Sequence, residues 1–312
     1  MRIVYMGTPY FAIRPLEELV GNGYDVVAVY TQPDRPMGRG RVIDEPPVKK
    51  AALKLNLNVV QPENLKSTEE ISRLAELKPD AIVVAAYGQI LRQIVLDIPP
   101  FGCINIHPSL LPVYRGMSPV PSAILNGDEF TGVSIMLLDK GVDTGPVLER
   151  AQIPVAAQDD TGLLMEKLSR LGAQLLLDTL PRWFNKAIIP QPQNNTNATY
   201  SKTLTKEVGK IDWNLSAMEL WRRVRAYQPW PGCFTQWQGK QIKILEAIPL
   251  MGDGNVEAGK VVAVKHESAA FGIRCGNGIL GVIKVQMEGK KIMTADEFLR
   301  GQKQILGAVL PS

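Results

Sequence analysis

Short apolar runs alternate with amphipathic stretches through the first part of the chain. The apolar runs predict β-strands at residues 1–6, 24–30, 57–60 and 81–86. The stretches between them predict helices at 11–20, at 48–55 and after the capping sequence Ser67-Thr68-Glu69-Glu70. Because strands that alternate with helices pair in parallel through helical crossovers, we expect an α/β fold with a doubly wound, mostly parallel sheet.

The pattern changes in the second part of the chain. Asp159 or Asp160 is expected to cap a long helix, and one apolar stripe typical of core packing follows it, formed by Leu164, Leu168, Leu171 and Leu175. Polar residues and two prolines then predict a linker, and glycines further along separate short alternating runs typical of a small β-barrel. We therefore expect a first domain at 1–188, a linker at 189–206 and a second domain at 207–312.

The turn after the first apolar run disfavours one common class of enzyme. Residues 6–11 read MGTPYF and lack the G-x-G-x-x-G pattern with which dinucleotide-binding folds approach a pyrophosphate. A lysine-containing phosphate loop is also missing from the sequence. A nicotinamide-dependent reaction is therefore disfavoured, and we expect Thr8 to cap the helix that follows.

The composition is that of an ordinary globular protein, with 45% hydrophobic and 21% charged residues. No apolar run reaches the roughly 18 residues that a membrane span needs. The chain starts with a strand-like run rather than a signal or transit peptide. The three cysteines lack metal-binding spacing. We expect a cytoplasmic protein that binds neither a membrane nor a metal.

Basic residues are concentrated in two places. Residues 1–188 carry 19 basic and 21 acidic side chains, whereas residues 189–312 carry 16 basic and 10 acidic ones. The segment 34–41 contains three arginines, two glycines and a proline, so it is neither a helix nor a central strand. Both regions suit a polyanionic partner, although ordinary solvated surface explains the same composition.

Candidate chemistry lies at the end of one short strand. The run 103–106 alternates, which brings Asn105 and His107 to the same face, and Pro108 ends the strand. Asp143 follows a second apolar run, VSIMLLD. An amide, an imidazole and a carboxylate suit chemistry at a carbonyl carbon, as oxyanion donor, proton carrier and orienting acid. A histidine beside a strand end is also often structural, and the spacing alone leaves both interpretations open.

Five stretches of the chain resemble the methionyl-tRNA formyltransferases in sequence, order and spacing: VYMGTPYFA, TQPDRPMGRGR, AAYGQIL, CINIHPSLLPVYRG and TGVSIMLLDKGVDTGPVL. KIDWNLSA and YQPWPGCF continue the resemblance, so it covers almost the whole chain. The set Asn105, His107 and Asp143 is that of the wider 10-formyltetrahydrofolate-dependent formyltransferase superfamily, and the arginine loop and the C-terminal block narrow it to the tRNA enzymes. The resemblance implies a Rossmann-like formyltransferase domain followed by an OB-like β-barrel that binds tRNA.

The same resemblance implies a reaction and a set of site residues. The chain is expected to transfer the formyl group of 10-formyltetrahydrofolate to the α-amino group of initiator methionyl-tRNA for translation initiation, as a monomer and without a metal. Asn105, His107 and Asp143 are then catalytic. The residues expected to bind the folate are Tyr87, Gly88, Gln89, Ile90, Leu91, Ser109, Leu110, Leu111, Pro112, Asp139, Lys140, Gly141 and Val142. The residues expected to bind tRNA are Arg35, Arg39, Arg41 and Lys206, with Arg39 as the key arginine.

One segment departs from the family pattern. Where the family usually has a basic residue, two small residues and a glutamine, this chain has Val113, Met117, Ser118 and Pro121. The resemblance therefore does not define the methionyl end of the acceptor site. Three alternatives stay open: a formyltransferase that acts on a small amine, a formyltetrahydrofolate hydrolase, and a non-catalytic RNA-binding protein. Folate turnover with and without tRNA distinguishes them.

Overall fold

The computed structural model describes residues 1–37, 42–252 and 257–311. The chain divides into two compact units, each of which contains several separate stretches of sequence. Unit 1 contains Met1–Pro119, Phe130–Pro154 and Met165–Ser201, and unit 2 contains Val120–Glu129, Val155–Leu164 and the described part of Lys202–Ser312. The functional division predicted at 188 and 207 rests on composition and stays a prediction.

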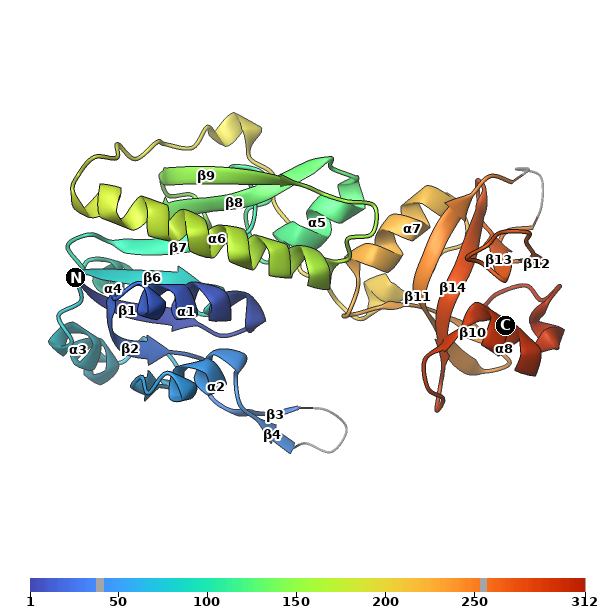
Figure 1. Cartoon of the computed structure of the whole chain (residues 1–312), viewed down its shortest axis with the longest axis horizontal. Helices are drawn as coiled ribbons and strands as arrows, with labels where there is room; N and C mark the ends of the chain where they lie inside the picture. Colours follow the sequence, from blue (N-terminus) through green and yellow to red (C-terminus); the bar gives the residue numbers. More distant parts are fainter. Residues whose placement is uncertain (38–41, 253–256, 312) are drawn as a thin grey trace. The chain divides into compact units, whose positions relative to one another are not determined.

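A seven-stranded sheet forms the centre of unit 1, in the order β5-β2-β1-β6-β7-β8-β9 (Figure 1). The first five strands of this order are parallel, and β8 is antiparallel to both of its neighbours, β7 and β9. The strands are β1 Arg2–Gly7, β2 Asp25–Tyr30, β5 Val59–Val60, β6 Ala81–Ala85, β7 Cys103–His107, β8 Phe130–Leu137 and β9 Val147–Pro154. The predicted α/β fold with a mostly parallel sheet is therefore confirmed.

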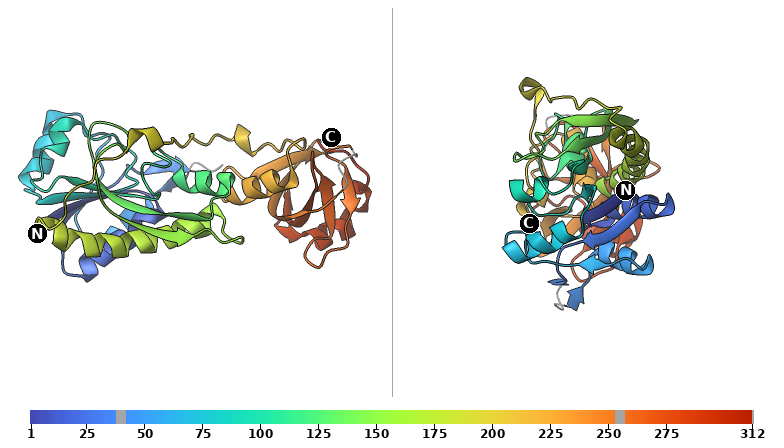
Figure 2. Two further views of the ribbon diagram at one scale, coloured as in Figure 1. Left: turned by 90° about the horizontal axis from the view of Figure 1, so that it is seen from above. Right: turned by 90° about the vertical axis from the view of Figure 1, so that its left-hand side faces the viewer.

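Helices cover both faces of this sheet (Figure 2). They are η1 Tyr10–Ala12, α1 Ile13–Gly21, α2 Pro47–Lys54, α3 Thr68–Glu76, α4 Gln93–Leu96 and α6 Thr161–Phe184, with a short η2 at Asn195–Asn197. Helix α6 packs closely over Ile106 and Val133, because a Cβ atom at Gly172 would press against both side chains. On the opposite face, Leu74 of α3 and Val95 of α4 belong to one buried cluster with the strand residues. Both faces are therefore buried, as a parallel sheet requires.

The helix-start signals in the sequence are largely present as hydrogen bonds. The Ser67 hydroxyl accepts a 3.2 Å hydrogen bond from the backbone N–H of Glu70 at the start of α3. The Asp160 carboxylate accepts a 2.8 Å hydrogen bond from the backbone N–H of Leu163, so Asp160 rather than Asp159 caps α6. None of the helices in the described parts of the chain is long and apolar enough to cross a membrane.

A two-stranded hairpin extends from unit 1 before α2. It pairs β3 Arg35–Met37 with β4 Val42–Asp44 in antiparallel fashion. The carboxylate of Asp34, directly before the hairpin, lies 2.5 Å from the ammonium of Lys49 in α2. A hydrogen bond from Gln61 and the contact with Lys49 lower the pKa of Asp34. The residue before β3 is therefore fixed to α2 by an ion pair and to Gln61 by a hydrogen bond.

Unit 2 is built around a six-stranded antiparallel sheet, in the order β10-β11-β14-β13-β12, with β15 also paired to β14. The strands are β10 Cys233–Trp237, β11 Lys240–Leu250, β12 Val261–Ala263, β13 Phe271–Arg274, β14 Ile279–Met287 and β15 Met293–Thr294. The helices are α5 Pro119–Asn126, η3 Glu207–Gly209, α7 Ala217–Ala226, α8 Ala295–Gly301 and η4 Lys303–Ile305. The predicted capping box of Ser216 and Glu219 is present at the start of α7. The second, smaller β-domain is thereby confirmed.

Two short stretches that precede the rest of unit 2 in the sequence, 120–129 and 155–164, are hydrogen-bonded to α7, the first through Arg222 and the Asn126 carbonyl at 3.4 Å. The Arg225 guanidinium donates hydrogen bonds to the backbone carbonyls of Asp159 (2.7 Å) and Ala156 (2.8 Å). It also stacks on the Trp221 ring, with 4.3 Å between the guanidinium carbon and the ring centroid. The Thr161 hydroxyl donates a 2.7 Å hydrogen bond to the last residue of α7. Composition did not indicate these contacts.

Candidate active site

Strand β7 carries two polar side chains into an otherwise apolar region. Asn105 is 8% exposed and His107 is 4% exposed. Asn105 is paired with Val84 of β6 on one side and with Met136 of β8 on the other. Because side chains alternate along a strand, Asn105 and His107 project from the same face of the sheet. Among the described residues, the Asn105 amide has no hydrogen-bond partner, so its N–H donors are available to a ligand.

The two ring nitrogens of His107 have different surroundings. Nε2 lies 3.0 Å from the backbone carbonyl oxygen of Tyr114. Because a carbonyl oxygen only accepts, Nε2 carries a proton and donates this hydrogen bond. Nδ1 lies 3.7 Å from Oδ2 of Asp143. Nδ1 is therefore the ring nitrogen that faces the carboxylate.

Asp143 reaches His107 through a connection that folds back along the sheet. Strand β8 is antiparallel to β7, so its last residue, Leu137, lies beside Ile104 rather than beside His107. The segment from β8 to β9 then returns toward the end of β7. The backbone of Asp143 has a φ of 52°, and its Oδ2 accepts a 2.8 Å hydrogen bond from the Gly116 N–H. Aspartate is among the few residues that adopt this left-handed conformation readily.

The turn before Asp143 is specified by its own polar atoms. The Asp139 carboxylate accepts hydrogen bonds from the Gly141 N–H (3.0 Å) and from the Thr144 hydroxyl (2.6 Å). A Cβ atom at Gly145 would overlap the backbone carbonyl of Leu137, so only glycine permits the close return of the chain. Hydrogen bonds within the turn and this close return therefore constrain the backbone on both sides of Asp143.

The loop after β7 is also held by buried hydrogen bonds. The Ser109 side chain is fully buried, and its hydroxyl donates a 2.5 Å hydrogen bond to the Val113 carbonyl. Ser134 donates a 2.7 Å hydrogen bond to the Ser109 carbonyl, and Arg150 donates a 2.8 Å hydrogen bond to the Leu111 carbonyl. Ser109 thus stabilises the loop and is not placed as a nucleophile. The sequence did not single out Ser134 or Arg150.

Leu138 contacts the buried clusters of two segments predicted to bind folate. It packs against one cluster that includes Tyr87 and Leu91, and against a second that includes Leu111. The third predicted segment, 139–142, follows Leu138 directly in the sequence, and its four residues are exposed. Leu138 therefore connects the buried residues of 87–91 and 109–112 to the start of 139–142.

Within those segments the side chains divide by exposure. The exposed residues are Gly88, Ile90, Asp139, Lys140, Gly141 and Val142. The buried residues are Tyr87, Leu91, Ser109 and Leu111, and the intermediate ones are Gln89, Leu110 and Pro112. Ile90 is 85% exposed and Val142 is 55% exposed, which is high for branched apolar side chains beside a buried polar site. The exposed group can touch a ligand, and the buried group supports the loops.

The segment after β6 is tied to the first turn of the chain. The Thr8 hydroxyl donates a 2.9 Å hydrogen bond to the Tyr87 carbonyl, which also accepts one of 3.2 Å from the Gln32 side chain. The prediction that Thr8 caps a helix is therefore wrong, because η1 starts after Pro9 without a side-chain cap. Burial raises the pKa of the Tyr87 phenol, whose oxygen has no partner among the described residues.

A buried arginine, Arg115, lies in the loop after β7, next to the Gly116 that donates to Asp143. Arg115 is 1% exposed, and its guanidinium is held by uncharged groups of the segment that composition had indicated as a linker. Nε and Nη2 donate to Oε1 of Gln193 at 3.0 and 2.8 Å, Nη2 donates to Asn195 at 2.9 Å, and Nη1 donates to the Tyr200 hydroxyl at 3.3 Å. Gln193, Asn195 and Tyr200 were missed because polar residues between prolines indicate a linker by composition alone.

The residues predicted to bind tRNA are placed only in part. Arg35 is exposed in β3 of unit 1, and Lys206 is exposed before η3 in unit 2. Arg39 and Arg41 lie outside the described residues.

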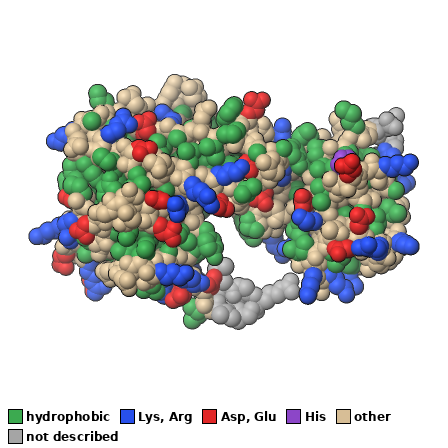
Figure 3. Space-filling view, in the orientation of Figure 1, with side chains coloured by type: hydrophobic (Ala, Val, Ile, Leu, Met, Phe, Trp, Pro, Cys, Tyr) green, Lys and Arg blue, Asp and Glu red, His purple; other side chains and the backbone are tan. Residues whose placement is uncertain are grey.

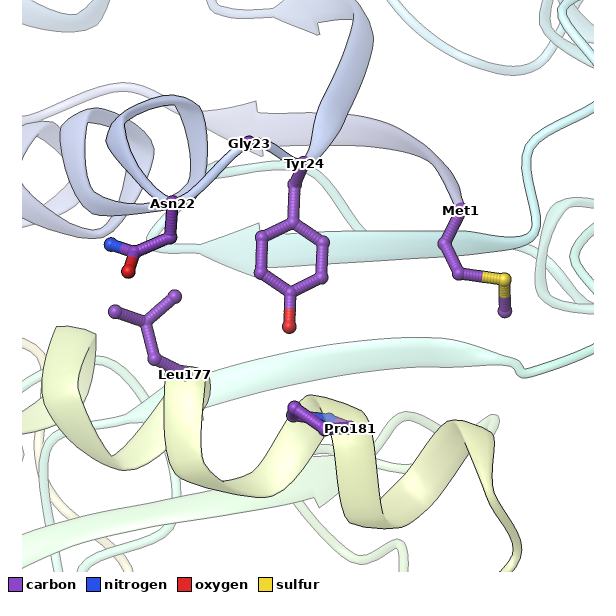
Figure 4. Close-up of a pocket in the computed structure, with 6 residues that line it drawn as sticks. All are labelled: Met1, Asn22, Gly23, Tyr24, Leu177 and Pro181. Atoms are coloured by element: carbon purple, nitrogen blue, oxygen red, sulfur yellow. The ribbon is translucent and has the colours of Figure 1, made fainter.

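A separate hollow in unit 1 does not belong to this site. The pocket in Figure 4 has a volume of about 350 Å³ and is lined by Met1, Asn22, Gly23, Tyr24, Leu177 and Pro181. It lies at the amino end of β1, whereas His107 is at the carboxyl end of the parallel strand β7. Among the described residues, no group of three or more His, Cys, Asp or Glu side chains could hold a metal ion.

Comparison with known proteins identifies both halves of the chain. The family described as formyl transferase matches residues 1–180, and its C-terminal domain matches residues 203–303. A methionyl-tRNA formyltransferase of Dehalococcoides mccartyi is 49% identical, over 99% of this chain and 98% of the relative. One of Caldanaerobacter subterraneus is 43% identical, over 99% of this chain and 100% of the relative.

Solved structures share the fold at lower identity. HypX from Aquifex aeolicus in complex with tetrahydrofolic acid superposes with a TM-score of 0.65 and 18% identity, over 99% of this chain. The chain spans about half the length of HypX, 48% of it. A sugar 3N-formyl transferase, WlaRD, superposes with a TM-score of 0.64 and 20% identity, over 93% of this chain and 99% of that one. Taken together with the sequence matches, these findings place the chain in the formyl transferase family, with both the N-terminal and the C-terminal domain of that family.

Proposed function

We propose that this chain transfers the formyl group of 10-formyltetrahydrofolate to the α-amino group of initiator methionyl-tRNA. The observation that carries this proposal is the convergence of Asn105, His107 and Asp143 from two distant stretches of sequence onto one end of β7. Relatives that match over nearly their whole length are named methionyl-tRNA formyltransferase, which supports the tRNA as acceptor.

We assign the role of oxyanion donor to Asn105. Negative charge develops on the formyl oxygen as the amine nitrogen bonds to the formyl carbon. The Asn105 amide has no hydrogen-bond partner among the described residues, so donating to that oxygen breaks no existing contact. A preorganised donor of this kind typically contributes about 3–4 kcal/mol to lowering the barrier.

We assign the movement of the proton to Nδ1 of His107. The attacking nitrogen loses a proton, and the nitrogen that leaves the formyl carbon gains one, so one group that accepts and returns a proton balances the reaction. Nε2 is occupied by the Tyr114 carbonyl, which leaves Nδ1 for this task. The Asp143 carboxylate, 3.7 Å from Nδ1, stabilises the ring while it carries the extra proton.

The exposed residues around the site fit a flat heteroaromatic donor. Ile90 and Val142 offer apolar walls, and the exposed backbone of 139–142 offers hydrogen-bonding groups for the edge of a ring. Leu91, next to Ile90 in the sequence, belongs to a buried cluster against which Leu138 packs. The donor itself supplies the activated formyl group, and the residues of the chain orient it and hold the proton.

The acceptor is proposed to bind through basic side chains on both units. Figure 3 shows Lys and Arg side chains on the C-terminal part of the chain. The exposed basic residues of unit 2 include Lys206, Lys210, Lys240, Lys265, Lys284, Lys290, Lys291, Arg300 and Lys303. Arg35, Arg39 and Arg41 are proposed to contact the same tRNA. Such contacts to phosphates make binding weaken as the salt concentration rises.

The setting of the reaction follows from its substrate. We propose that the chain works in the bacterial cytoplasm, where charged initiator tRNA is used, and that it acts as a monomer. Light scattering at working concentration would measure the mass directly; a stable dimer would contradict the monomer.

The test of the function is formyl transfer from 10-formyltetrahydrofolate to charged initiator tRNA, with wild type beside His107→Ala. The expected result is formylation by wild type and its loss in the variant. If the folate is consumed with a small amine or with water, but not with methionyl-tRNA, the chain is a folate-dependent enzyme that does not act on this tRNA. If His107→Ala formylates methionyl-tRNA as fast as wild type, the assignment of the active site to His107 is refuted.

A further inference from the structure

The segment between the two matched domains carries contacts that neither domain explains. It pairs with β9 through Gln191 and Val147, whose backbones exchange hydrogen bonds of 2.8 and 2.9 Å. Further on, the backbones of Arg115 and Thr199 are hydrogen-bonded at 2.9 Å, and the Ser201 N–H donates to the Arg115 carbonyl at 2.8 Å. The segment thus lies along the two loops that present the catalytic candidates.

One side chain of this segment, Gln193, uses both ends of its amide. Its Oε1 accepts two hydrogen bonds from the Arg115 guanidinium, at 3.0 and 2.8 Å. Its Nε2 donates to the backbone carbonyls of Asp143 at 2.9 Å and of Gly145 at 2.7 Å. A guanidinium only donates and a carbonyl only accepts, so the amide has a single satisfactory orientation.

The two hydrogen bonds from Gln193 reach the backbone of the turn at Asp143 itself and at Gly145. Asp143 has a left-handed backbone, and a rotation there would move its carboxylate away from His107. Gln193 holds the carbonyl of Asp143 and that of Gly145 two residues later. Arg115 in turn is buried and is held by Gln193 and its neighbours. A chain of hydrogen bonds therefore connects the interior of unit 1 to the catalytic carboxylate.

We propose that Gln193 is a positioning residue of the active site, which sets the direction of the Asp143 carboxylate toward His107 through the carbonyls of Asp143 and Gly145. The proposal rests on the catalytic roles given above to His107 and Asp143. Gln193 does not touch the reacting atoms. Its contribution is to keep the Asp143 carboxylate where it stabilises a protonated His107 ring.

The discriminating variant is Gln193→Glu. Glutamate has nearly the same shape, and its carboxylate still accepts both hydrogen bonds from Arg115. It has no N–H to donate, so both backbone carbonyls lose their partner and face a negative oxygen. The expected result is a fall in kcat of about 10-fold to 100-fold, with the KM values for tRNA and folate nearly unchanged. The melting temperature should stay close to that of wild type, because the buried Arg115 gains a charged partner.

The matched control is Asn195→Asp. Asn195 also accepts a hydrogen bond from Arg115, at 2.9 Å, so this variant makes the same change of amide to carboxylate beside the same guanidinium. None of its hydrogen bonds reaches the Asp143 turn. The control should keep the wild-type kcat. An equal fall of kcat in both variants would assign the effect to charge near Arg115 and overturn the proposal.

A second readout observes His107 directly. His107 and His266 are the two histidines of the chain, so ¹⁵N-labelled histidine in untagged protein gives two ring spectra, which His266→Gln assigns. Gln193→Glu should change the ¹⁵N signals of the His107 ring and leave those of His266 unchanged. A loss of activity that follows only a loss of thermal stability, with unchanged His107 signals, would indicate a purely structural role and overturn the proposal.

His107→Ala, measured in the same assay, distinguishes a failure of the catalytic site from a failure of the role of Gln193. If His107→Ala abolishes transfer and Gln193→Glu keeps the kcat of the Asn195→Asp control, the proposed site stands and the role of Gln193 is refuted. If His107→Ala retains transfer, the catalytic site itself is misassigned.

Discussion

His107 and Asp143 face each other across 3.7 Å, with Nδ1 of the ring toward Oδ2 of the carboxylate. The ring cannot turn without giving up the 3.0 Å hydrogen bond from Nε2 to the Tyr114 carbonyl. The carboxylate cannot turn freely because Gly116 donates to it at 2.8 Å. The pair is therefore held from both sides at a distance that permits attraction without a direct hydrogen bond.

Asp143→Asn tests the charge of this pair. Asparagine tolerates the left-handed backbone and still accepts the hydrogen bond from Gly116, so the fold should persist. Because the protonated ring loses its counter-charge, kcat should fall by roughly a hundredfold or more. Steady-state kinetics at saturating substrates measures this. Asp139→Asn makes the same change in the same turn and should be much milder; comparable losses would show that the turn, not the charge at Asp143, matters.

Asn105→Ala tests the oxyanion donor. The amide has no hydrogen-bond partner among the described residues, so its removal should hardly alter the melting temperature. Loss of one donor to the developing charge should lower kcat by about 10²- to 10³-fold. Single-turnover formylation would measure the chemical step. An unchanged rate, or a large fall in stability, would count against the assigned role.

Arg115→Met tests the buried guanidinium. The change removes every side-chain hydrogen bond of a residue that is 1% exposed, and it leaves the half-buried Gln193 oxygen without its donor. The Asn195 oxygen is exposed and can bond to water instead. The free energy of unfolding should fall by about 2–4 kcal/mol. Arg73→Met is the control, because Arg73 pairs with Glu69 on the surface and should matter little. Urea unfolding of both variants gives the comparison, and equal stabilities would refute the claim.

Gly145→Ala tests the close return of the chain before β9. An added Cβ atom would overlap the Leu137 carbonyl, which cannot move aside without disturbing the strand. We expect a loss of about 1–3 kcal/mol in the free energy of unfolding and a lower kcat. Gly21→Ala has open space around it and should be neutral or slightly stabilising. Thermal melts distinguish the two, and a harmless Gly145→Ala would show that the turn is adaptable.

Arg39→Ala tests the arginine loop in tRNA binding. The KM for tRNA should rise, or kcat should fall, while the KM for the folate stays the same. If Arg39 contacts a phosphate, the slope of log affinity against log salt concentration should decrease by about one. Arg14→Ala, at an exposed pair with Glu18 in α1, removes the same charge elsewhere and should leave tRNA kinetics unchanged. Identical kinetics for wild type and Arg39→Ala would exclude the role.

Much of the architecture was predictable because its causes are local. The alternating run at β7 placed Asn105 and His107 on one face, and the buried run at β6 indicated the middle of a parallel sheet. The capping residues Ser67 and Ser216 marked helix starts within a few residues of sequence. These predictions succeeded because hydrogen bonds and side-chain direction over three or four residues depend little on the rest of the chain.

The residues of the candidate site could be proposed from the sequence, but their geometry could not. The resemblance named Asn105, His107 and Asp143, but nothing local indicated which ring nitrogen of His107 faces the carboxylate. The Thr8 prediction failed for a related reason, since its hydroxyl has a better partner in the Tyr87 carbonyl than a helix could offer. A side chain chooses among partners that only the folded chain brings near.

The sequence by itself determined the order of strands and helices, the two β-containing parts and the candidate chemistry at the end of β7. Only the tertiary structure decided that residues 120–129 and 155–164 belong with the C-terminal sheet, and that the segment after Ile188 is hydrogen-bonded to the Asp143 turn through Gln193. Composition describes that segment as polar and proline-containing, which is equally true of a free linker. The difference lies in the hydrogen-bond partners of the Gln193 amide. These are the buried Arg115, 78 residues away, and the carbonyl of Asp143, 50 residues away, and they meet Gln193 only when the sheet has formed.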